Sequence, residues 1–192
     1  MQIDIPLIIR RYAEGWFLMA NEDGDSLDWH TSRSRAIIPL DESFRYPKSL
    51  QRVLKQERFS VAINRDFDAV VAGCADREST WISPQLQEIY KALHQAGWAY
   101  SFETWQGDRL AGGILGIAIC GAFIGESMFF HIPEGSKVAM VKLVQRLRDR
   151  RFLMFDAQIM NSHLARFGAY TVNQQQYHLL LTQVLLHRCS LT

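Results

Sequence analysis

Three strand-like runs lie between residues 99 and 130, and a short turn joins each to the next. The runs are AYSFETW (99–105), LAGGILGIAIC (110–120) and AFIGESMFF (122–130), with turns at Gln106-Gly107-Asp108 and near Gly121. Connections this short leave consecutive strands no route except to double back beside one another, so the runs predict an antiparallel meander. Any fold for this chain must be built around that meander.

Helix and strand signals on both sides of the meander complete the pattern. In SPQLQEIYKALHQAG, Ser83 is a candidate N-cap, Pro84 suits the first turn and Gly97 suits the end of a helix. Helices are expected at 5–14, 47–57, 67–75, 83–97, 136–150 (with Ser136 as its cap), 163–168 and 173–188, strands at 36–40, 59–64 and 152–159, and loops at 22–35 and 77–80. Helices on a mostly antiparallel central sheet predict an α+β domain.

Composition and residue spacing argue against several function classes. The 192 residues suffice for one core, or for one domain with a small appendage. A formal net charge of +1 is unlike that of a strongly basic nucleic-acid-binding protein, although it leaves room for a local basic patch. The 3 cysteines and 6 histidines show no CxxC or HExxH spacing, which argues against a disulfide framework or a zinc site. Signal-peptide order and membrane-length apolar stretches are both absent, so we expect a cytoplasmic protein.

Two of the most apolar segments contain acids. GAFIGESMFF (121–130) carries Glu126, and FLMFDAQIM (152–160) carries Asp156 and Gln158. Burial of an unpaired carboxylate is costly, so each acid needs a partner. Strand alternation predicts that Asp156 and Gln158 share one face, that Phe155, Ala157 and Ile159 point to the other, and that Glu126 shares its face with Ile124 and Met128.

These residue types suit an amino-acid-like substrate. A carboxylate can hold a cationic amine, and an aspartate with a glutamine can orient a second amine and a carbonyl. The surrounding apolar side chains would accept an aliphatic or aromatic group. The structural alternative stays open, because an acid in a strand often caps a backbone amide or pairs with an arginine.

Several ordered motifs, with their spacing, resemble those of the leucyl/phenylalanyl-tRNA–protein transferases. The motifs are TWI (80–82), SFETW (101–105), AGGILG (111–116), GESMF (125–129), SK (136–137), DAQ (156–158) and HLARFGA (163–169), with CA (74–75), RRYAEG (10–15) and SRA (34–36) extending the likeness. A series of motifs in the same order is far more specific than any one of them.

The resemblance implies an aminoacyltransferase that moves leucine or phenylalanine from aminoacyl-tRNA to the N-terminal Arg or Lys of acceptor proteins, which marks them for degradation by the N-degron pathway. It implies an acetyltransferase-like (GNAT) fold over residues 36–192, preceded by a truncated N-terminal subdomain and loop at 1–35. It also implies that no metal or organic cofactor is needed, because the aminoacyl ester is already activated. A monomer is expected.

Site residues follow from the resemblance position by position. Asp156 and Gln158 occupy the catalytic DxQ positions, where Asp156 would bind the incoming α-amine or orient Gln158, and Glu126 would grip the aminoacyl end of the tRNA. The residues expected to bind substrate are Trp81 and Tyr90 at the terminal adenosine, Ile114, Phe123, Met128, Met140, Leu143 and Phe155 around the side chain, and Asn161 at the polar end. Expected tRNA contacts are Lys137, Lys142, Arg146, Arg150 and Arg151, for which a solvated helix face is the alternative.

The sequence departs from the family pattern at several positions. The chain begins just before RRYAEG, so we expect the family's N-terminal stretch with its GGDL-type motif to be missing. Leu18-Met19-Ala20 stands where the family has PWF, which removes an aromatic expected to hold adenosine. Tyr100, Phe130 and Ala157 replace a usual histidine, serine and cysteine; Ala157 is expected to point away from the site.

Two other functions compete with the transferase. An acetyl-CoA-dependent acetyltransferase on the same fold needs a glycine- and arginine-rich pyrophosphate loop, whereas FFHIPEGSK (129–137) offers one glycine at that junction. A non-catalytic module that binds tRNA or basic N-termini is the other alternative.

Overall fold

The computed structural model describes residues 3–21, 23–76 and 80–192, and it confirms the meander. The meander consists of β5 (Ala99–Gln106), β6 (Arg109–Ile119) and β7 (Ala122–Phe130). It forms the middle of a seven-stranded sheet with the order β4-β5-β6-β7-β8-β3-β9. Neighbouring strands pair antiparallel except β7 and β8, which are parallel, so the sheet is mixed.

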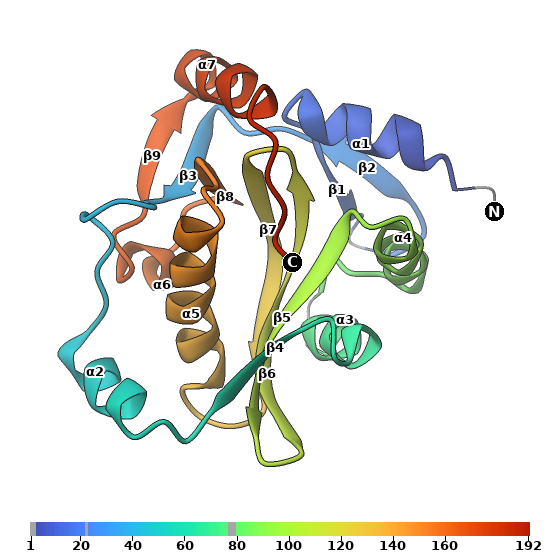
Figure 1. The fold of residues 1–192 in the computed structure, drawn as a ribbon. Coiled ribbons are helices and arrows are strands. Elements are labelled where there is room, and N and C mark those ends of the chain that lie inside the picture. Colours follow the sequence, from blue (N-terminus) through green and yellow to red (C-terminus); the bar gives the residue numbers. More distant parts are fainter. Residues whose placement is uncertain (1–2, 22, 77–79) are drawn as a thin grey trace.

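The remaining elements surround this sheet (Figure 1). The other strands are β1 (Phe17–Ala20) and β2 (Leu27–His30), which form a separate two-stranded sheet, and β3 (Ser34–Ile38), β4 (Ser60–Ile63), β8 (Met154–Gln158) and β9 (Tyr170–Asn173). The helices are α1 (Ile5–Ala13), α2 (Lys48–Lys55), α3 (Phe67–Ala75), α4 (Pro84–Gln95), α5 (Gly135–Asp149), α6 (Ser162–Ala165) and α7 (Gln174–Leu185).

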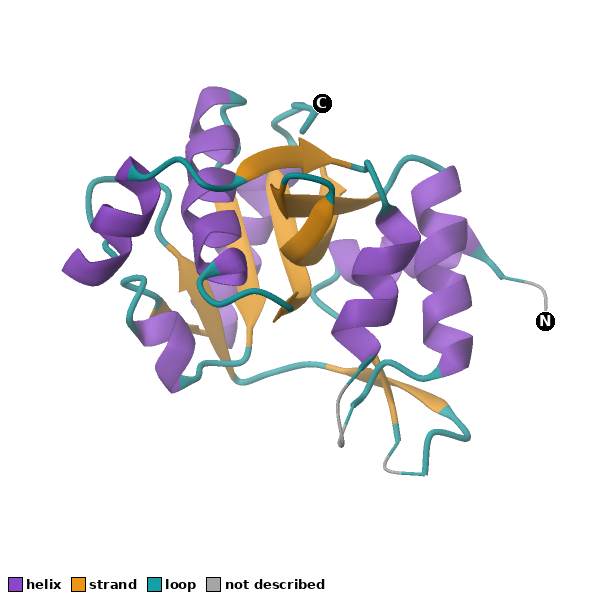
Figure 2. Cartoon of the chain, turned by 90° about the horizontal axis from the view of Figure 1, so that it is seen from below, coloured by secondary structure: helices purple, strands orange, loops and turns teal. Residues whose placement is uncertain are grey.

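Helices cover both faces of the sheet (Figure 2). On one face α1, α3 and α4 bury a cluster that includes Tyr12, Val70 and Tyr90 against Leu115 and Ile124 of the sheet. On the other face α5 and α2 bury a second cluster against Ile114, Phe123 and Phe155. A third cluster lies where α7 packs on β3 and β8. The α+β prediction is therefore confirmed at the level of a mixed sheet covered by helices.

Local signals placed some boundaries correctly and others not. Ser83 caps α4 as predicted, because its hydroxyl accepts a hydrogen bond from the Leu86 amide. Ser136 is not a cap, since α5 begins at Gly135 and Glu134 precedes it with a left-handed φ of 75°. The loop expected at 22–35 is wrong: β2 and the start of β3 lie within it. The loop expected at 77–80 falls largely outside the described residues.

Candidate functional site

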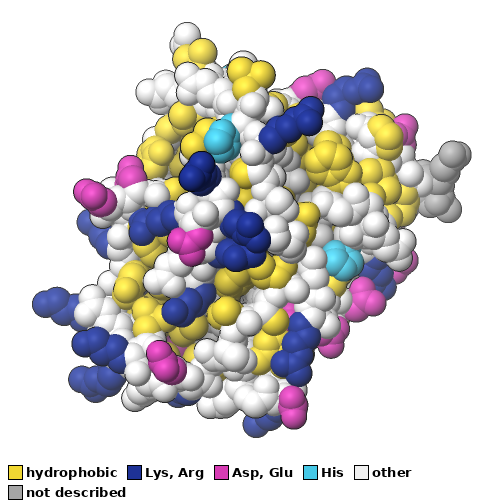
Figure 3. Space-filling model, viewed as in Figure 1, with side chains coloured by type: hydrophobic (Ala, Val, Ile, Leu, Met, Phe, Trp, Pro, Cys, Tyr) yellow, Lys and Arg dark blue, Asp and Glu magenta, His cyan; other side chains and the backbone are white. Residues whose placement is uncertain are grey.

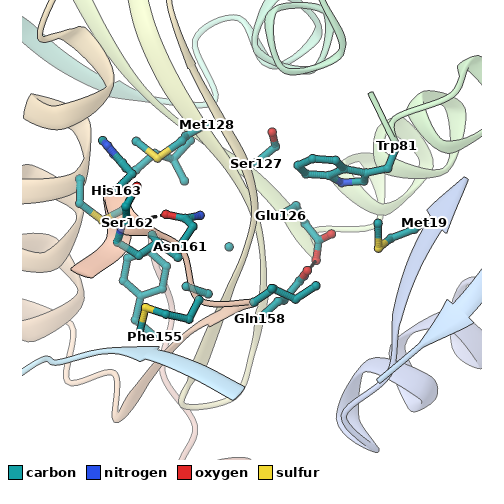
Figure 4. A pocket seen from close by; sticks show the side chains of 17 residues that line it. Met19, Trp81, Glu126, Ser127, Met128, Phe155, Gln158, Asn161, Ser162 and His163 are labelled. Carbon is teal, nitrogen blue, oxygen red and sulfur yellow. Dashed lines mark hydrogen bonds between the residues drawn. The ribbon is translucent and has the colours of Figure 1, made fainter. Parts of the chain in front are cut away.

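A cavity opens where the one parallel strand pair of the sheet comes apart. β7 and β8 pair only from Ala122 and Met154 to Ile124 and Asp156. The residues that follow on each strand line a pocket of about 530 Å³, together with residues from β6, α5, α6 and the segments around Met19 and Trp81. Figure 4 shows Glu126 and Gln158 facing each other, with Trp81 and Met19 on one side and Met128, Asn161 and His163 on the other.

A β-bulge places Glu126 at this cavity. The register of β6 and β7 passes from Gly116 opposite Gly125 to Leu115 opposite Ser127, so Glu126 has no partner across the pair. A bulge of this kind re-aims a side chain and reverses the alternation beyond it. Ile124 accordingly packs in the cluster under α4, while Met128 packs in the cluster under α5. The prediction that Ile124, Glu126 and Met128 share one face is wrong for this reason.

Glu126 is buried but hydrogen-bonded at both oxygens. Its Oε2 accepts from the Tyr90 hydroxyl at 2.7 Å, and its Oε1 accepts from the Gln158 side-chain amide at 3.1 Å. Burial raises the pKa of Glu126 to about 7, although these two hydrogen bonds favour the ionised form. The carboxyl group is therefore near half-ionised at neutral pH, which suits a group that holds a cation or exchanges a proton.

A second phenol stands behind Glu126 and was not predicted from the sequence. The Tyr12 side chain is 1% exposed, and its hydroxyl lies near Glu126 and Tyr90. Burial and then the nearby Glu126 carboxylate raise the pKa of Tyr12 well above its ordinary value. Tyr12 lies within the RRYAEG motif, the one signal that pointed to this segment.

Asp156 lies behind the pocket and does not line it. Its side chain is fully buried, and Arg35 of β3 binds it through Nε at 3.0 Å from each carboxylate oxygen and through Nη2 at 2.8 Å from Oδ2. The Tyr177 hydroxyl donates to Oδ2 at 2.8 Å, and the Gln158 backbone amide donates to Oδ1 at 2.8 Å. Asp156 is thus bound on every side by groups of the protein itself.

A second bulge separates the side chains of Asp156 and Gln158. In the pairing of β3 with β8, Ile37 faces Asp156 and Ala36 faces Gln158, so Ala157 is the extra residue. Gln158 also has a φ of 61°, in the left-handed region. Its side chain therefore turns into the pocket toward Glu126 instead of sharing a face with Asp156. Ala157 lines the pocket, contrary to the prediction that it points away.

Comparison with known proteins identifies the family. Residues 37–182 match the family described as leucyl/phenylalanyl-tRNA protein transferase. The chain belongs to that family. Leucyl/phenylalanyl-tRNA–protein transferases from Nostoc punctiforme and Trichormus variabilis are 70% and 71% identical to it, each over all of both chains. The one from Synechocystis is 62% identical over all of this chain and 96% of its own.

A solved structure is similar in fold to this member of the leucyl/phenylalanyl-tRNA–protein transferase family. L-PGS from Bacillus licheniformis aligns with 97% of this chain and 72% of its own, with a TM-score of 0.51 and 12% sequence identity. An identity this low shows a shared fold only. Within the described parts of this transferase-family chain, no helix has the length and apolar character needed to cross a membrane.

Most substrate-binding residues expected for a leucyl/phenylalanyl-tRNA–protein transferase line the pocket. Trp81 and Asn161 do, and so do the apolar residues Ile114, Met128, Met140 and Phe155. The same pocket includes residues that we did not predict to bind substrate: Met19, Gly125, Ser127, Ile159, Met160, Ser162, His163 and Leu164. Several of these follow the DAQ motif directly, so the motif itself was the available signal.

Three predicted contacts of this leucyl/phenylalanyl-tRNA–protein transferase family member are corrected. Tyr90 is fully buried and donates to Glu126, so it is not placed to stack on an adenosine. Phe123 stands behind the wall, with its ring edge-on to Phe155 at a centroid distance of 5.3 Å. Leu143 is buried inside the cluster under α5. Tyr90 and Phe123 thus contact residues that line the pocket, and none of the three residues lines it itself.

The basic residues expected to contact tRNA lie on or just after α5. Lys137 forms an ion pair with Glu134 at 2.9 Å, and Arg146 Nε donates to the Leu191 carbonyl at 2.9 Å. Lys142 is half-buried, whereas Arg150 and Arg151 are exposed. On the face of the molecule that Figure 3 shows, lysine and arginine side chains gather on the half where α2 and α5 lie, with a few acids between them. Among the described residues, no three His, Cys, Asp or Glu side chains converge as a metal site.

Proposed function

We propose that the pocket holds the aminoacyl group of a charged tRNA, and that the protein transfers leucine or phenylalanine from that tRNA to the N-terminal Arg or Lys of acceptor proteins. The degradation of the modified proteins is the consequence that the family resemblance implies. The relatives that carry this activity in their names match the whole chain at high identity. The observation that carries the proposal is a buried, hydrogen-bonded carboxylate at the polar end of an apolar cavity.

The apolar part of the pocket fits the amino-acid side chain. Ile114, Met128, Met140 and Phe155 bring four large apolar side chains to one wall, and a volume of about 530 Å³ is within the ordinary range for small-molecule sites. Two of the four are methionines, whose unbranched side chains adapt to differently shaped partners. A wall of this kind accepts both a branched aliphatic group and an aromatic ring.

The polar end fits the groups that react. The acceptor amine attacks the ester carbonyl carbon; a C–N bond forms, the C–O bond to the ribose breaks, and the proton lost by the amine ends on the ribose hydroxyl. Glu126 holds the cationic α-amine of the aminoacyl group, and Gln158 orients the ester by hydrogen bonding, because an amide is not basic enough to remove a proton.

The remaining parts of the proposal concern tRNA binding, the division of the chain into domains, the oligomeric state and the location of the protein. Trp81 and Met19 lie on one side of Glu126, where the terminal adenosine would lie against them. Lys137, Lys142, Arg146, Arg150 and Arg151 would contact tRNA phosphates. Residues 36–192 would form a GNAT-like catalytic domain, which the mixed sheet supports, with 1–35 as an N-terminal subdomain. The protein would act as a monomer in the cytoplasm.

A transfer assay tests the proposal directly. Labelled leucine or phenylalanine on tRNA is offered with a peptide that begins with arginine, and the matched control is the same peptide with its N-terminus acetylated. Label on the free peptide and none on the blocked one is the expected result. Binding of charged tRNA without any transfer would instead favour the non-catalytic binding module.

A further inference from the structure

The carboxylate of Asp156 has no surface left for a substrate. Arg35 Nε, Arg35 Nη2, the Tyr177 hydroxyl and the Gln158 backbone amide donate to its two oxygens, at distances from 2.8 to 3.0 Å. The side chain is fully buried and does not line the pocket. Asp156 therefore acts through a group that does reach the pocket, and Gln158 is the only one of its partners that does so among the residues described.

Arg35 is held rigidly enough to fix Asp156. Its side chain is 1% exposed, and its guanidinium lies between two aromatic rings, 4.8 Å from the Phe17 centroid and 4.6 Å from the Tyr177 centroid. The remaining Nη1 donates to the Gly15 carbonyl at 3.1 Å. Burial disfavours the charged form, but the Asp156 carboxylate outweighs it and raises the pKa of Arg35. An arginine bound on both edges and both faces is a fixed frame for the carboxylate.

Gln158 needs such a frame, because its backbone conformation is unfavourable. A φ of 61° is uncommon for a residue other than glycine and persists only where surrounding contacts impose it. The contact present here is the 2.8 Å hydrogen bond from the Gln158 amide to Asp156 Oδ1. In that conformation the Gln158 side chain reaches Glu126 at 3.1 Å. Loss of the hydrogen bond would release the side chain from the pocket.

We propose that Arg35 and Tyr177 are positioning residues for the transfer reaction, which fix Asp156 so that its Oδ1 holds Gln158 in the left-handed conformation that the reaction requires. This inference rests on the proposed function. It assigns Asp156 to the support of the site, whereas Glu126 and Gln158 touch substrate.

Gly15, which follows α1, packs closely against Tyr177 and accepts a hydrogen bond from Arg35. Gly15 has a φ of 91°, and a Cβ placed on it would lie 2.9 Å from Cε1 of Tyr177. The Gly15 carbonyl also accepts from Arg35, so a substitution there disturbs both positioning residues at once. Gly15 is in this way connected to Gln158 through Arg35 and Asp156, although Gly15 itself does not line the pocket.

Tyr177→Phe is the mildest test, because it removes one hydrogen bond and no volume. We expect kcat to fall about tenfold, the size of one lost hydrogen bond to a charged group, while KM for aminoacyl-tRNA stays within about twofold. Arg35→Lys keeps a buried positive charge but loses the planar set of N–H donors of the guanidinium. It should likewise lower kcat while leaving KM for aminoacyl-tRNA nearly unchanged. The matched controls are Tyr170→Phe, on an exposed tyrosine of β9, and Arg33→Lys, on an exposed arginine; both should behave as wild type. Wild-type kcat in folded Tyr177→Phe and Arg35→Lys would overturn the proposal.

A double variant in which Asp156 and Arg35 are both replaced by neutral residues tests whether Asp156 positions Gln158 or takes part in the reaction through its charge. Asp156→Asn keeps an oxygen that can accept from the Gln158 amide, and Arg35→Met removes the charge left unpaired by that change. Each single variant leaves one buried group uncompensated and should lose most activity, whereas the double variant should exceed Asp156→Asn by about tenfold or more. A double variant no better than Asp156→Asn alone would show that the Asp156 charge itself takes part in the reaction, which overturns the proposal.

The hydrogen-exchange rate of the Gln158 backbone amide measures how firmly Asp156 holds it, and this measurement does not depend on transfer activity. Exchange should be faster in Tyr177→Phe than in wild type and unchanged in Tyr170→Phe; equal exchange in both variants contradicts the proposal. If wild type transfers nothing, the proposed function fails, and exchange still decides whether Arg35 and Tyr177 fix Gln158.

Discussion

Burial of Glu126 makes the stability of the protein depend on pH in a way that one substitution isolates. Below about pH 4.5 the carboxyl group is protonated in the folded and the unfolded chain alike. As the pH rises from there to about 7, the unfolded chain releases the proton while the folded protein keeps it, so folding becomes less favourable. Above about pH 7 the carboxyl group is ionised in both the folded and the unfolded chain, and the full destabilisation from burying the charge is present.

The size of this effect follows from the pKa of Glu126. A rise from 4.5 to about 7 corresponds to about 3 kcal/mol, at about 1.36 kcal/mol for each pH unit. Glu126→Gln removes the titration while keeping the shape, an oxygen for the Gln158 amide and an amide that can donate to the Tyr90 hydroxyl. The wild-type protein should therefore lose about 3 kcal/mol relative to the glutamine variant between pH 4.5 and pH 8.

Urea denaturation of both proteins across this pH range measures the difference, and the other titrating groups cancel because both proteins contain them. Two stability curves that stay parallel from pH 4.5 to pH 8 would refute the reasoning. The same titration should appear in transfer: kcat/KM of the wild-type protein should rise with pH through about 7, since the ionised Glu126 holds the α-amine.

Three further variants test other parts of the site. Tyr90→Phe removes the 2.7 Å donor to Glu126, so the midpoint of the pH profile of kcat/KM should move upward; an unmoved midpoint contradicts this. Alanine at both Arg150 and Arg151 should weaken tRNA binding at low salt and matter less at high salt, measured by fluorescence anisotropy. Gly112→Ala places a Cβ 2.7 Å from the Phe129 carbonyl oxygen and 2.8 Å from the Ser136 amide, so urea denaturation should show a loss of about 2 kcal/mol or more.

Local sequence signals predicted those parts of the fold that local interactions determine. The helix at 83–97 was found because a serine cap, a proline in the first turn and a closing glycine all lie within it, and α4 spans Pro84–Gln95. The meander was found because its turns are short. The strands β1, β2 and β9 were missed, since each has only four residues. β1 and β2 pair with each other, whereas β9 pairs with β3, which lies far away in the sequence.

The site was predictable in its residues but not in their orientation. An acid inside an apolar run drew attention to Glu126 and Asp156, because a buried carboxylate needs a partner. Which partner each finds depends on the register of neighbouring strands, and a bulge of one residue in each pair reversed the expected faces. The partner of Asp156 is Arg35, 121 residues away and within a segment expected to be a loop. No local pattern contains that information.

The buried ion pair of Arg35 and Asp156 is better explained by the positioning of Gln158 than by a contribution to stability. A buried Arg–carboxylate pair is often no more stabilising than well-packed apolar residues of the same volume, because desolvation of both charges offsets their attraction. Stability alone therefore gives little reason to place Arg35 and Asp156 behind the pocket. An apolar pair could not hold the Gln158 amide in its left-handed conformation, since only an acceptor at Oδ1 can do so. The polar atoms of Arg35 and Tyr177 converge on the Asp156 carboxylate, and Oδ1 of that carboxylate accepts from the backbone amide of Gln158, whose side chain faces Glu126 across the pocket.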